Sequence, residues 1–296
     1  MSTNDLRRLA NEIITRLLLE KTGQTLKSDR LWRVDSVVES VLRKRGISKT
    51  TDLITLLTQS DSEAFQQELV EALLNNETYF FRDRLVFDQL AGQVLPQLAV
   101  VKEPTRQLSI WSAGCSTGQE PLSLAMMLLD QGPRWRNWRI DIWATDVSDC
   151  AIKAARQATF SQFEIQRGLG VGQMLEYFEE TERGWRATDK LRRMVRFERR
   201  NMLDAPPKGV KFDLILCRNL LLYLHPDARN QVCHNLAGAM APHSCLLLGG
   251  GEALLDQRSL LAPALGDFGM FQLASNVAHA HGARPHIALR RGAGAR

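Results

Sequence analysis

Apolar positions in the first 75 residues recur at steps of three and four, the spacing of one buried face on an amphipathic helix. These steps predict four helices, over residues 6–19, 31–45, 52–58 and 65–74. Gly46 is a suitable stop for the second helix, since glycine readily adopts the left-handed conformation past a helix end. Asp29 and Asp61 are candidate N-caps, because a carboxylate accepts N–H groups of a first turn. Residues 1–75 are therefore expected to form a small helical domain.

After about residue 84 the pattern changes to short apolar runs that alternate with helical segments. Strands are predicted at 107–113, 139–145, 191–198, 211–217 and 244–250. Helices are predicted at 85–99, 119–130, 148–157 and 226–240. Short apolar strands connected by helices are typical of a parallel sheet that is covered on both faces. The fold class is therefore α/β and doubly wound, with the helical domain in front.

Two segments do not follow this alternation. Residues 158–190 are polar and contain several glycines, so we expect an excursion from the sheet there. Residues 291–296 are expected to be a disordered tail, as chain ends often are. The α/β domain is accordingly assigned to residues 85–290.

Composition narrows the class of protein further. With 44% hydrophobic and 24% charged residues, the chain has the balance of an ordinary globular protein. The net charge of +5 allows an acidic partner without identifying one. The five cysteines are widely spaced and form no C-x-x-C pair, which argues against disulfides and zinc and favours a cytoplasmic location. We expect no metal site and, since no run of 18 apolar residues is present, no membrane insertion.

The turn after the first predicted strand, "AGCSTGQEP" at 113–121, has the position of a ligand-binding turn in an open α/β sheet. It lacks the G-x-G-x-x-G pattern of dinucleotide-binding proteins. Glu120 also lies in the first turn of the following helix, where a phosphate would bind. A carboxylate there repels phosphate but suits a ligand that carries an ammonium or sulfonium group.

Asp146 ends the second predicted strand, where a carboxylate can accept hydrogen bonds from both hydroxyls of a ribose. A ribose at one end, a positive charge at the other and no phosphate between them describe S-adenosylmethionine. Each residue also has a simpler interpretation: Glu120 complements the helix dipole, and Asp146 caps the following helix. Their occurrence at two successive strand ends favours the cofactor.

Three motifs carry a resemblance to a known family. They are "NNETYFFRD" at 75–83, "SAGCSTGQEPLSLAM" at 112–126 and "FDLILCRNLLLYL" at 212–224. In order, spacing and position after a helical bundle, they resemble the CheR family, methyltransferases that esterify glutamates on bacterial chemoreceptors. The resemblance implies a Rossmann-like methyltransferase domain, a linker at 76–84 that contributes to the cofactor site, and a small β-subdomain inserted at about 158–190.

The resemblance also implies roles for individual residues. Asn201 and Met202 would flank the adenine, Arg218 and Asn219 would lie beneath the methionine portion, and Arg82 and Tyr223 would be nearest the transferred methyl. The implied cofactor contacts are Asn76, Thr78, Arg82, Glu120, Asp146, Asn201, Met202, Arg218 and Asn219.

Some of these residues have simpler interpretations. Arg82 could pair with Asp83 or another acid on the surface, and Tyr223 could serve packing alone. Phe80 and Phe81 are interpreted as core between the domains rather than as part of the cofactor site. The chemistry nevertheless fits the resemblance, because a glutamate acceptor is already ionised at neutral pH and needs no general base. Arg82 can hold that carboxylate by a charge-assisted hydrogen bond, and Tyr223 can donate another.

The second predicted helix is basic, and the resemblance favours it as the docking surface for the acidic helices of a chemoreceptor's cytoplasmic region. The candidate docking residues are Arg30, Arg33, Arg43 and Lys44. The alternative is an ordinary solvated face. In the segment 176–191 the Tyr177–Phe178 pair is followed by a short acidic turn with one glycine, so binding of a receptor's C-terminal pentapeptide tether is not expected.

Three alternatives to this function are a nucleic-acid methyltransferase, a cofactor-binding sensor and a methyltransferase with an acceptor outside chemotaxis. A nucleic-acid methyltransferase would need a proline-containing loop after the fourth strand, where this chain has "CRNLLLY", so nucleic acid is not expected as a partner. A cofactor-binding sensor would keep the fold without turnover, and a receptor-like protein outside chemotaxis could be the acceptor. The sequence favours a protein-glutamate O-methyltransferase in chemotaxis that uses S-adenosylmethionine and releases S-adenosylhomocysteine.

Overall fold

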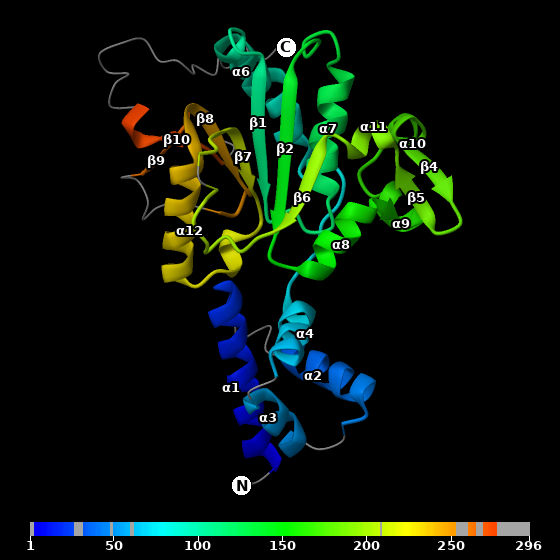
Figure 1. Cartoon of the computed structure of the whole chain (residues 1–296), viewed down its shortest axis with the longest axis vertical. Coiled ribbons are helices and arrows are strands. Elements are labelled where there is room, and N and C mark those ends of the chain that lie inside the picture. Colours follow the sequence, from blue (N-terminus) through cyan, green and yellow to red (C-terminus); the bar gives the residue numbers. More distant parts are fainter. Residues whose placement is uncertain are drawn as a thin grey trace, which may run out of the picture. The chain divides into compact units, whose positions relative to one another are not determined.

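The computed structural model describes residues 3–26, 32–47, 50–59, 62–207, 209–252, 260–264 and 269–276. The chain forms two compact units (Figure 1). The smaller unit comprises Met1–Asn75 and Tyr223–Arg229, and the larger comprises Asn76–Leu222 and Asn230–Arg296. No helix among the described residues is long and apolar enough to cross a membrane.

The described residues of the smaller unit form four α-helices, close to the predicted ranges. They are α1 (Thr3–Thr22), α2 (Trp32–Arg45), α3 (Thr50–Thr58) and α4 (Glu63–Leu73). Their apolar faces meet in a core that includes Ile14, Leu53 and Leu69, each fully buried. Because the helical spacing of apolar residues and the buried face coincide, local sequence accounts for this unit.

The ends of two helices test the predicted caps. Helix α2 stops at Gly46, which has a φ of 67°, and the N–H groups of Gly46 and Ile47 donate to the carbonyls of Arg43 and Leu42. This is the Schellman arrangement, and it confirms the predicted stop. The residue that precedes α4 is Ser62. The candidate caps Asp29 and Asp61 lie outside the described residues.

The larger unit is built on a seven-stranded sheet in the order β6-β2-β1-β7-β8-β10-β9. The chain winds outwards from β1 to β2 and β6, then returns to β7 and β8 on the other side of β1. These five strands are parallel, and β10 and β9 add antiparallel pairs. The predicted doubly wound α/β class is confirmed. The strands are β1 (Gln107–Ala113), β2 (Arg139–Asp146), β6 (Val195–Arg199), β7 (Phe212–Cys217), β8 (Met240–Leu248), β9 (Leu261–Pro263) and β10 (Met270–Leu273).

Helices pack on this sheet, α7 and α8 against β2 and β6, and α6 against β1 and β8 (Figure 1). The predicted helix at 85–99 is in fact two α-helices joined by a π-helical turn, η2. The helical segments of this unit outside the insertion are α5 (Arg84–Gln89), η2 (Leu90–Val94), α6 (Leu95–Lys102), α7 (Gln119–Asp130), α8 (Asp149–Gln157), the 3-10 turn η3 (Leu221–Tyr223) and α12 (Pro226–Ala239). The last two extend into the smaller unit.

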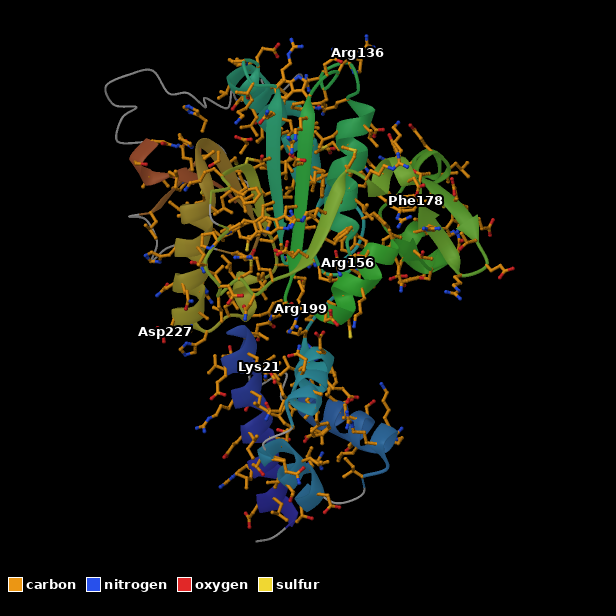
Figure 2. The ribbon with its side chains drawn as sticks, in the orientation of Figure 1. Lys21, Arg136, Arg156, Phe178, Arg199 and Asp227 are labelled. Carbon is orange, nitrogen blue, oxygen red and sulfur yellow. The ribbon has the colours of Figure 1, made fainter. Side chains whose placement is uncertain are left out.

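Between β2 and β6 the chain leaves the sheet and forms a small antiparallel one, in the order β3-β5-β4. Phe80 packs edge-on against Phe160 and Phe178 of this insertion, with ring centroids 4.9 and 5.4 Å away, and Figure 2 labels Phe178 there. Phe80 therefore belongs to the core of the larger unit. The elements of the insertion are β3 (Thr159–Phe160), α9 (Gln162–Gln166), α10 (Val171–Tyr177), β4 (Phe178–Thr181), β5 (Gly184–Ala187) and α11 (Asp189–Arg192).

Two strand boundaries differ from the prediction. The strand expected at 191–198 begins at Val195, because the residues before it form α11. The N–H of Arg192 donates to the carbonyl of Thr188, and the apolar side chain of Leu191 is buried from this helical turn. The strand expected at 244–250 begins at Met240 and ends at Leu248.

Candidate active site

The turn after β1 brings three backbone segments together at the carboxyl end of the sheet. The N–H groups of Gly114 and Cys115 both donate to the carbonyl of Thr145. Gly118 has a φ of 97°, and a Cβ there would lie 3.1 Å from that of Ala155 and 3.2 Å from the ring of Phe197. Glycine thus satisfies both the backbone conformation and the close packing of this turn.

Asp146 connects this turn to the next one. Its carboxylate accepts the N–H of Ser116 at 2.8 Å and the N–H of Ser148 at 2.9 Å, and the residue is 8% exposed. The N-cap of α8 is Ser148, so the simpler interpretation of Asp146 as the helix cap is wrong, and Asp146 instead holds the N–H of that cap residue. A carboxylate has about four acceptor positions, so this geometry also permits hydrogen bonds from ribose hydroxyls.

Two other predicted cofactor residues lie beside Asp146. The hydroxyl of Ser116 donates to the carbonyl of Asn76 at 2.7 Å. The N–H of Arg200 donates to the carbonyl of Asp146, so Asn201 follows directly at the same end of the sheet. In Figure 2 this end is marked by Arg199, far from Arg136 at the opposite end. Met202, next along the chain, is buried.

Glu120 is paired with Arg218, which the sequence analysis did not anticipate. Its carboxylate accepts the hydroxyl of Ser112 at 2.8 Å and Nη1 of Arg218 at 3.1 Å. Nη2 of Arg218 donates to a carboxylate oxygen of Asp83 at 2.6 Å and to the carbonyl of Arg82 at 2.9 Å. The Arg218 side chain is 2% exposed. Two carboxylates around one guanidinium leave a net negative charge, so the site still suits a cationic ligand.

Arg82 itself does not pair with Asp83, which is engaged by Arg218 instead. The guanidinium of Arg82 instead donates to the carbonyl of Glu77 at 3.1 Å and lies 5.7 Å from the ring centre of Tyr79. Thr78, another predicted cofactor residue, lies between these two and is half-buried.

The segment 76–83 is fixed to the larger unit along its length. The N–H of Phe81 donates to the hydroxyl of Ser123 at 2.9 Å. Arg167 of the insertion forms an ion pair of 2.9 Å with Glu77. A Cβ on Gly168 would lie only 1.8 Å from the carbonyl oxygen of Phe80, so the two backbones are in close contact. The position of Arg82 therefore depends on the insertion as well as on Arg218.

Glu252, which is not among the residues predicted from the sequence, organises the loop after β7. Its carboxylate accepts the N–H groups of Asn219 at 2.9 Å, Gly249 at 2.7 Å and Leu222 at 3.3 Å. Asn219 has a φ of 58°, an unusual conformation for a residue with a side chain. The signal was the sequence "GGGE" at 249–252, an acid directly after the glycines that end the last parallel strand.

Tyr223 belongs to the smaller unit. There its phenol oxygen accepts a hydrogen bond from the amide of Asn75 at 2.7 Å, and its carbonyl accepts the N–H of Thr25 at 2.8 Å. Its role beside the transferred methyl remains a prediction.

Comparison with known proteins decides the family. Residues 76–265 match the family described as "CheR methyltransferase, SAM binding domain". The chain belongs to the CheR methyltransferase family. It is 31% identical over 243 residues to the "Chemotaxis protein methyltransferase" of Vibrio parahaemolyticus, covering 81% of this chain and 87% of that protein. It is 32% identical over 245 residues to "Chemotaxis protein methyltransferase 1" of Pseudomonas aeruginosa, covering 81% and 88%.

Membership of the CheR family confirms the predicted recognition, the S-adenosylmethionine cofactor and methyl transfer in chemotaxis. The site fits this cofactor. The buried carboxylate of Asp146 lies where ribose hydroxyls are bound in such sheets, and the group around Arg218 is net negative.

Two thiols, those of Cys115 and Cys217, lie near this CheR site and are inert. Burial raises the pKa of the Cys115 thiol well above its usual range, and the neighbouring carboxylates of Asp146 and Glu120 raise it further. Burial likewise raises the pKa of Cys217 well above its usual range. Both side chains therefore stay protonated and unreactive at neutral pH.

The predicted docking residues of CheR helix α2 are partly described. Arg43 and Lys44 are exposed in its last turn, and neither forms an ion pair with another described residue. Arg33 is half-buried, and Arg30 lies outside the described residues. The neighbouring Arg45 is used internally, in an ion pair of 2.6 Å with Glu68.

Proposed function

We propose that this chain transfers the methyl group of S-adenosylmethionine to glutamate side chains of chemoreceptors in the cytoplasm. The family match supports the reaction. The position of Arg82 is the observation that supports an acceptor carboxylate at this site. The backbone carbonyl of Arg82 is joined through the guanidinium of Arg218 to Glu120, at the carboxyl end of the parallel strands, where cofactors bind in such sheets. An arginine held there is suited to bind a carboxylate acceptor.

The proposed cofactor contacts all lie near the carboxyl ends of the parallel strands. Asp146 accepts the ribose hydroxyls, and Asn201 and Met202, which follow β6, flank the adenine. Arg218 and Asn219 lie beneath the methionine portion. The remaining contacts are assigned to the segment that closes over the cofactor and to the start of α7, namely Asn76, Thr78, Arg82 and Glu120.

When bound, S-adenosylmethionine supplies an electrophilic methyl group that passes from its sulfur to the acceptor oxygen, leaving S-adenosylhomocysteine. The protein needs no general base, because a glutamate side chain is ionised at neutral pH. Arg82 holds the acceptor carboxylate, and Tyr223 donates a hydrogen bond that orients it. The protein therefore works by positioning two reactants and excluding water between them.

The exposed cations of α2, Arg43 and Lys44, support docking of an acidic receptor helix, together with Arg33 and Arg30. We do not expect the small β-sheet to bind a receptor's C-terminal pentapeptide. Its β4–β5 hairpin turns through Glu182 and Arg183 alone, between the paired residues Thr181 and Gly184. Calorimetry of a receptor C-terminal peptide should give no heat, and micromolar binding would refute this expectation.

The function is tested with methyl-labelled S-adenosylmethionine and cytoplasmic fragments of chemoreceptors. After incubation, mild alkali is added and volatile labelled methanol is counted. Alkali-labile label is expected, because carboxyl methyl esters hydrolyse under these conditions. Alkali-stable label would assign the methyl to nitrogen. Cofactor binding without label on any receptor fragment would identify a sensor instead.

A further inference from the structure

Glu252 is a buried acid that the proposed reaction does not use. It is 9% exposed and lies four residues after the end of β8. One carboxylate oxygen accepts the N–H groups of Asn219 and Gly249, and the other accepts that of Leu222. Its carboxylate therefore fastens the loop after β7 to the end of the neighbouring strand.

This loop, residues 218–222, carries two residues of the proposed cofactor site, Arg218 and Asn219. It begins with Arg218, whose guanidinium binds the carbonyl of Arg82. It ends at Leu222, directly before Tyr223. Asn219 adopts a left-handed backbone conformation, which asparagine tolerates but which needs a stabilising contact to be kept. The N–H of this strained residue is one of the three bound by Glu252.

We propose that Glu252 is a positioning residue for methyl transfer, whose carboxylate holds loop 218–222 so that Arg218 and Asn219 are presented correctly. This inference rests on the proposed function, since it gives the loop a catalytic duty. Glu252 acts through these residues and is not assigned a contact with either substrate.

The variant Glu252→Gln keeps the shape of the side chain but replaces one acceptor oxygen by an NH₂ group. A single carbonyl oxygen can still accept the N–H groups of Asn219 and Gly249, which leaves the N–H of Leu222 facing a donor. We expect kcat to fall about tenfold or more while the Kd for S-adenosylmethionine stays within about threefold, as for a group that orients reactants. The melting temperature should change by less than about 3 °C.

Neighbouring glycines provide a second, matched test. A Cβ on Gly249 would lie 2.8 Å from the carboxylate of Glu252 and 3.0 Å from the backbone nitrogen of Asn219. A Cβ on Gly250 would meet nothing within 4 Å. Gly249→Ala should therefore lower kcat like Glu252→Gln, and Gly250→Ala should stay within about twofold of the wild-type value.

Hydrogen exchange of the peptide covering 218–222 completes the test, because it needs no acceptor protein. Exchange should be about tenfold faster in Glu252→Gln and Gly249→Ala than in the wild-type protein and Gly250→Ala. Unchanged exchange in both altered proteins would overturn the inference about Glu252, whether or not the wild-type protein forms methyl esters. Failure of the wild-type protein to form methyl esters would count against the proposed function instead. Unchanged kcat, or a fall in kcat matched by equal losses of cofactor affinity and melting temperature, would also overturn the inference about Glu252.

Discussion

The carboxylate of Asp146 has a structural role in joining two turns and a proposed role in binding the cofactor. Its carboxylate accepts the N–H groups of Ser116 and Ser148, and in the proposed complex it also accepts the ribose hydroxyls. The residue that joins two turns is therefore also the residue proposed to bind the ribose, so a substitution at this position should affect the site directly.

We expect Asp146→Ala to weaken binding of S-adenosylmethionine by about 2 kcal/mol, the usual range for hydrogen bonds to a charged group. Calorimetry of the cofactor measures this loss. Asp141→Ala, on the solvent-exposed part of the same strand where Asp141 pairs with Arg139, is the control and should bind normally. Equal affinity of the two altered proteins would contradict the assignment of Asp146.

We expect Arg82→Ala to abolish methyl ester formation and to leave most of the cofactor affinity in place, because the acceptor carboxylate loses its partner. Arg82→Lys should rescue poorly, since an ammonium cannot reproduce the planar fork of a guanidinium. Arg84→Ala is the matched control, because Arg84 is exposed and pairs with Asp88 within its own helix. Full turnover by Arg82→Ala in the methanol assay would refute the catalytic assignment.

Among the secondary-structure elements, the insertion has a structural duty in the site. Phe80 packs on its aromatic side chains, Arg167 pairs with Glu77, and the backbone of Gly168 touches that of Phe80. The small sheet thus supports the segment that carries Arg82, whether or not it binds any part of a receptor.

Gly168→Ala should show this dependence. The added methyl would overlap the carbonyl of Phe80, and the φ of Gly168 is 100°, so strain and overpacking should destabilise the protein by about 2 kcal/mol or more. Denaturant unfolding measures the change. Gly170→Ala and Gly172→Ala are controls, because a Cβ at either position meets nothing within 4 Å. If all three variants had the same free energy of unfolding, the close contact between Gly168 and Phe80 would not contribute to stability.

The sequence predicted some elements to the residue and missed others for identifiable reasons. Strand β1 and helix α7 were placed correctly because an apolar run, a glycine turn and an amphipathic period follow one another locally. The last two residues of helix α11 were assigned to a strand, because a buried Leu191 fits either period in so short a segment. The pairing of Glu120 with Arg218 joins residues 98 positions apart, and no local pattern reports such a contact.

For the whole molecule, the net charge of +5 matters less for partner binding than the positions of the cations that have no acidic neighbour. Many cations in the described part of the chain are neutralised nearby, as Arg45 is by Glu68 and Lys102 by Asp213. Arg43 and Lys44 form no ion pair with a described residue and so remain available for an acidic partner.

We expect Arg43→Glu to raise the KM for a receptor fragment about tenfold with little change in kcat or cofactor affinity, because rim charges act mainly on encounter. The effect should shrink as salt is added. Arg8→Glu is the control for net charge, since Arg8 is an exposed cation on α1 that pairs with Glu12. An equal rise in KM for both variants would show that overall charge, and not this helix, attracts the receptor.

The exposure of its cysteines makes the protein suitable for labelling at one thiol. Four of the five cysteines are buried, and the fifth, Cys150, is exposed near the start of α8. It lies two residues after Ser148, whose N–H is held by Asp146. A maleimide fluorophore should therefore attach at a single position, without mutagenesis, four residues along the chain from Asp146, the proposed ribose ligand. Cofactor titrations can then be followed by the emission of a dye placed there by the native sequence.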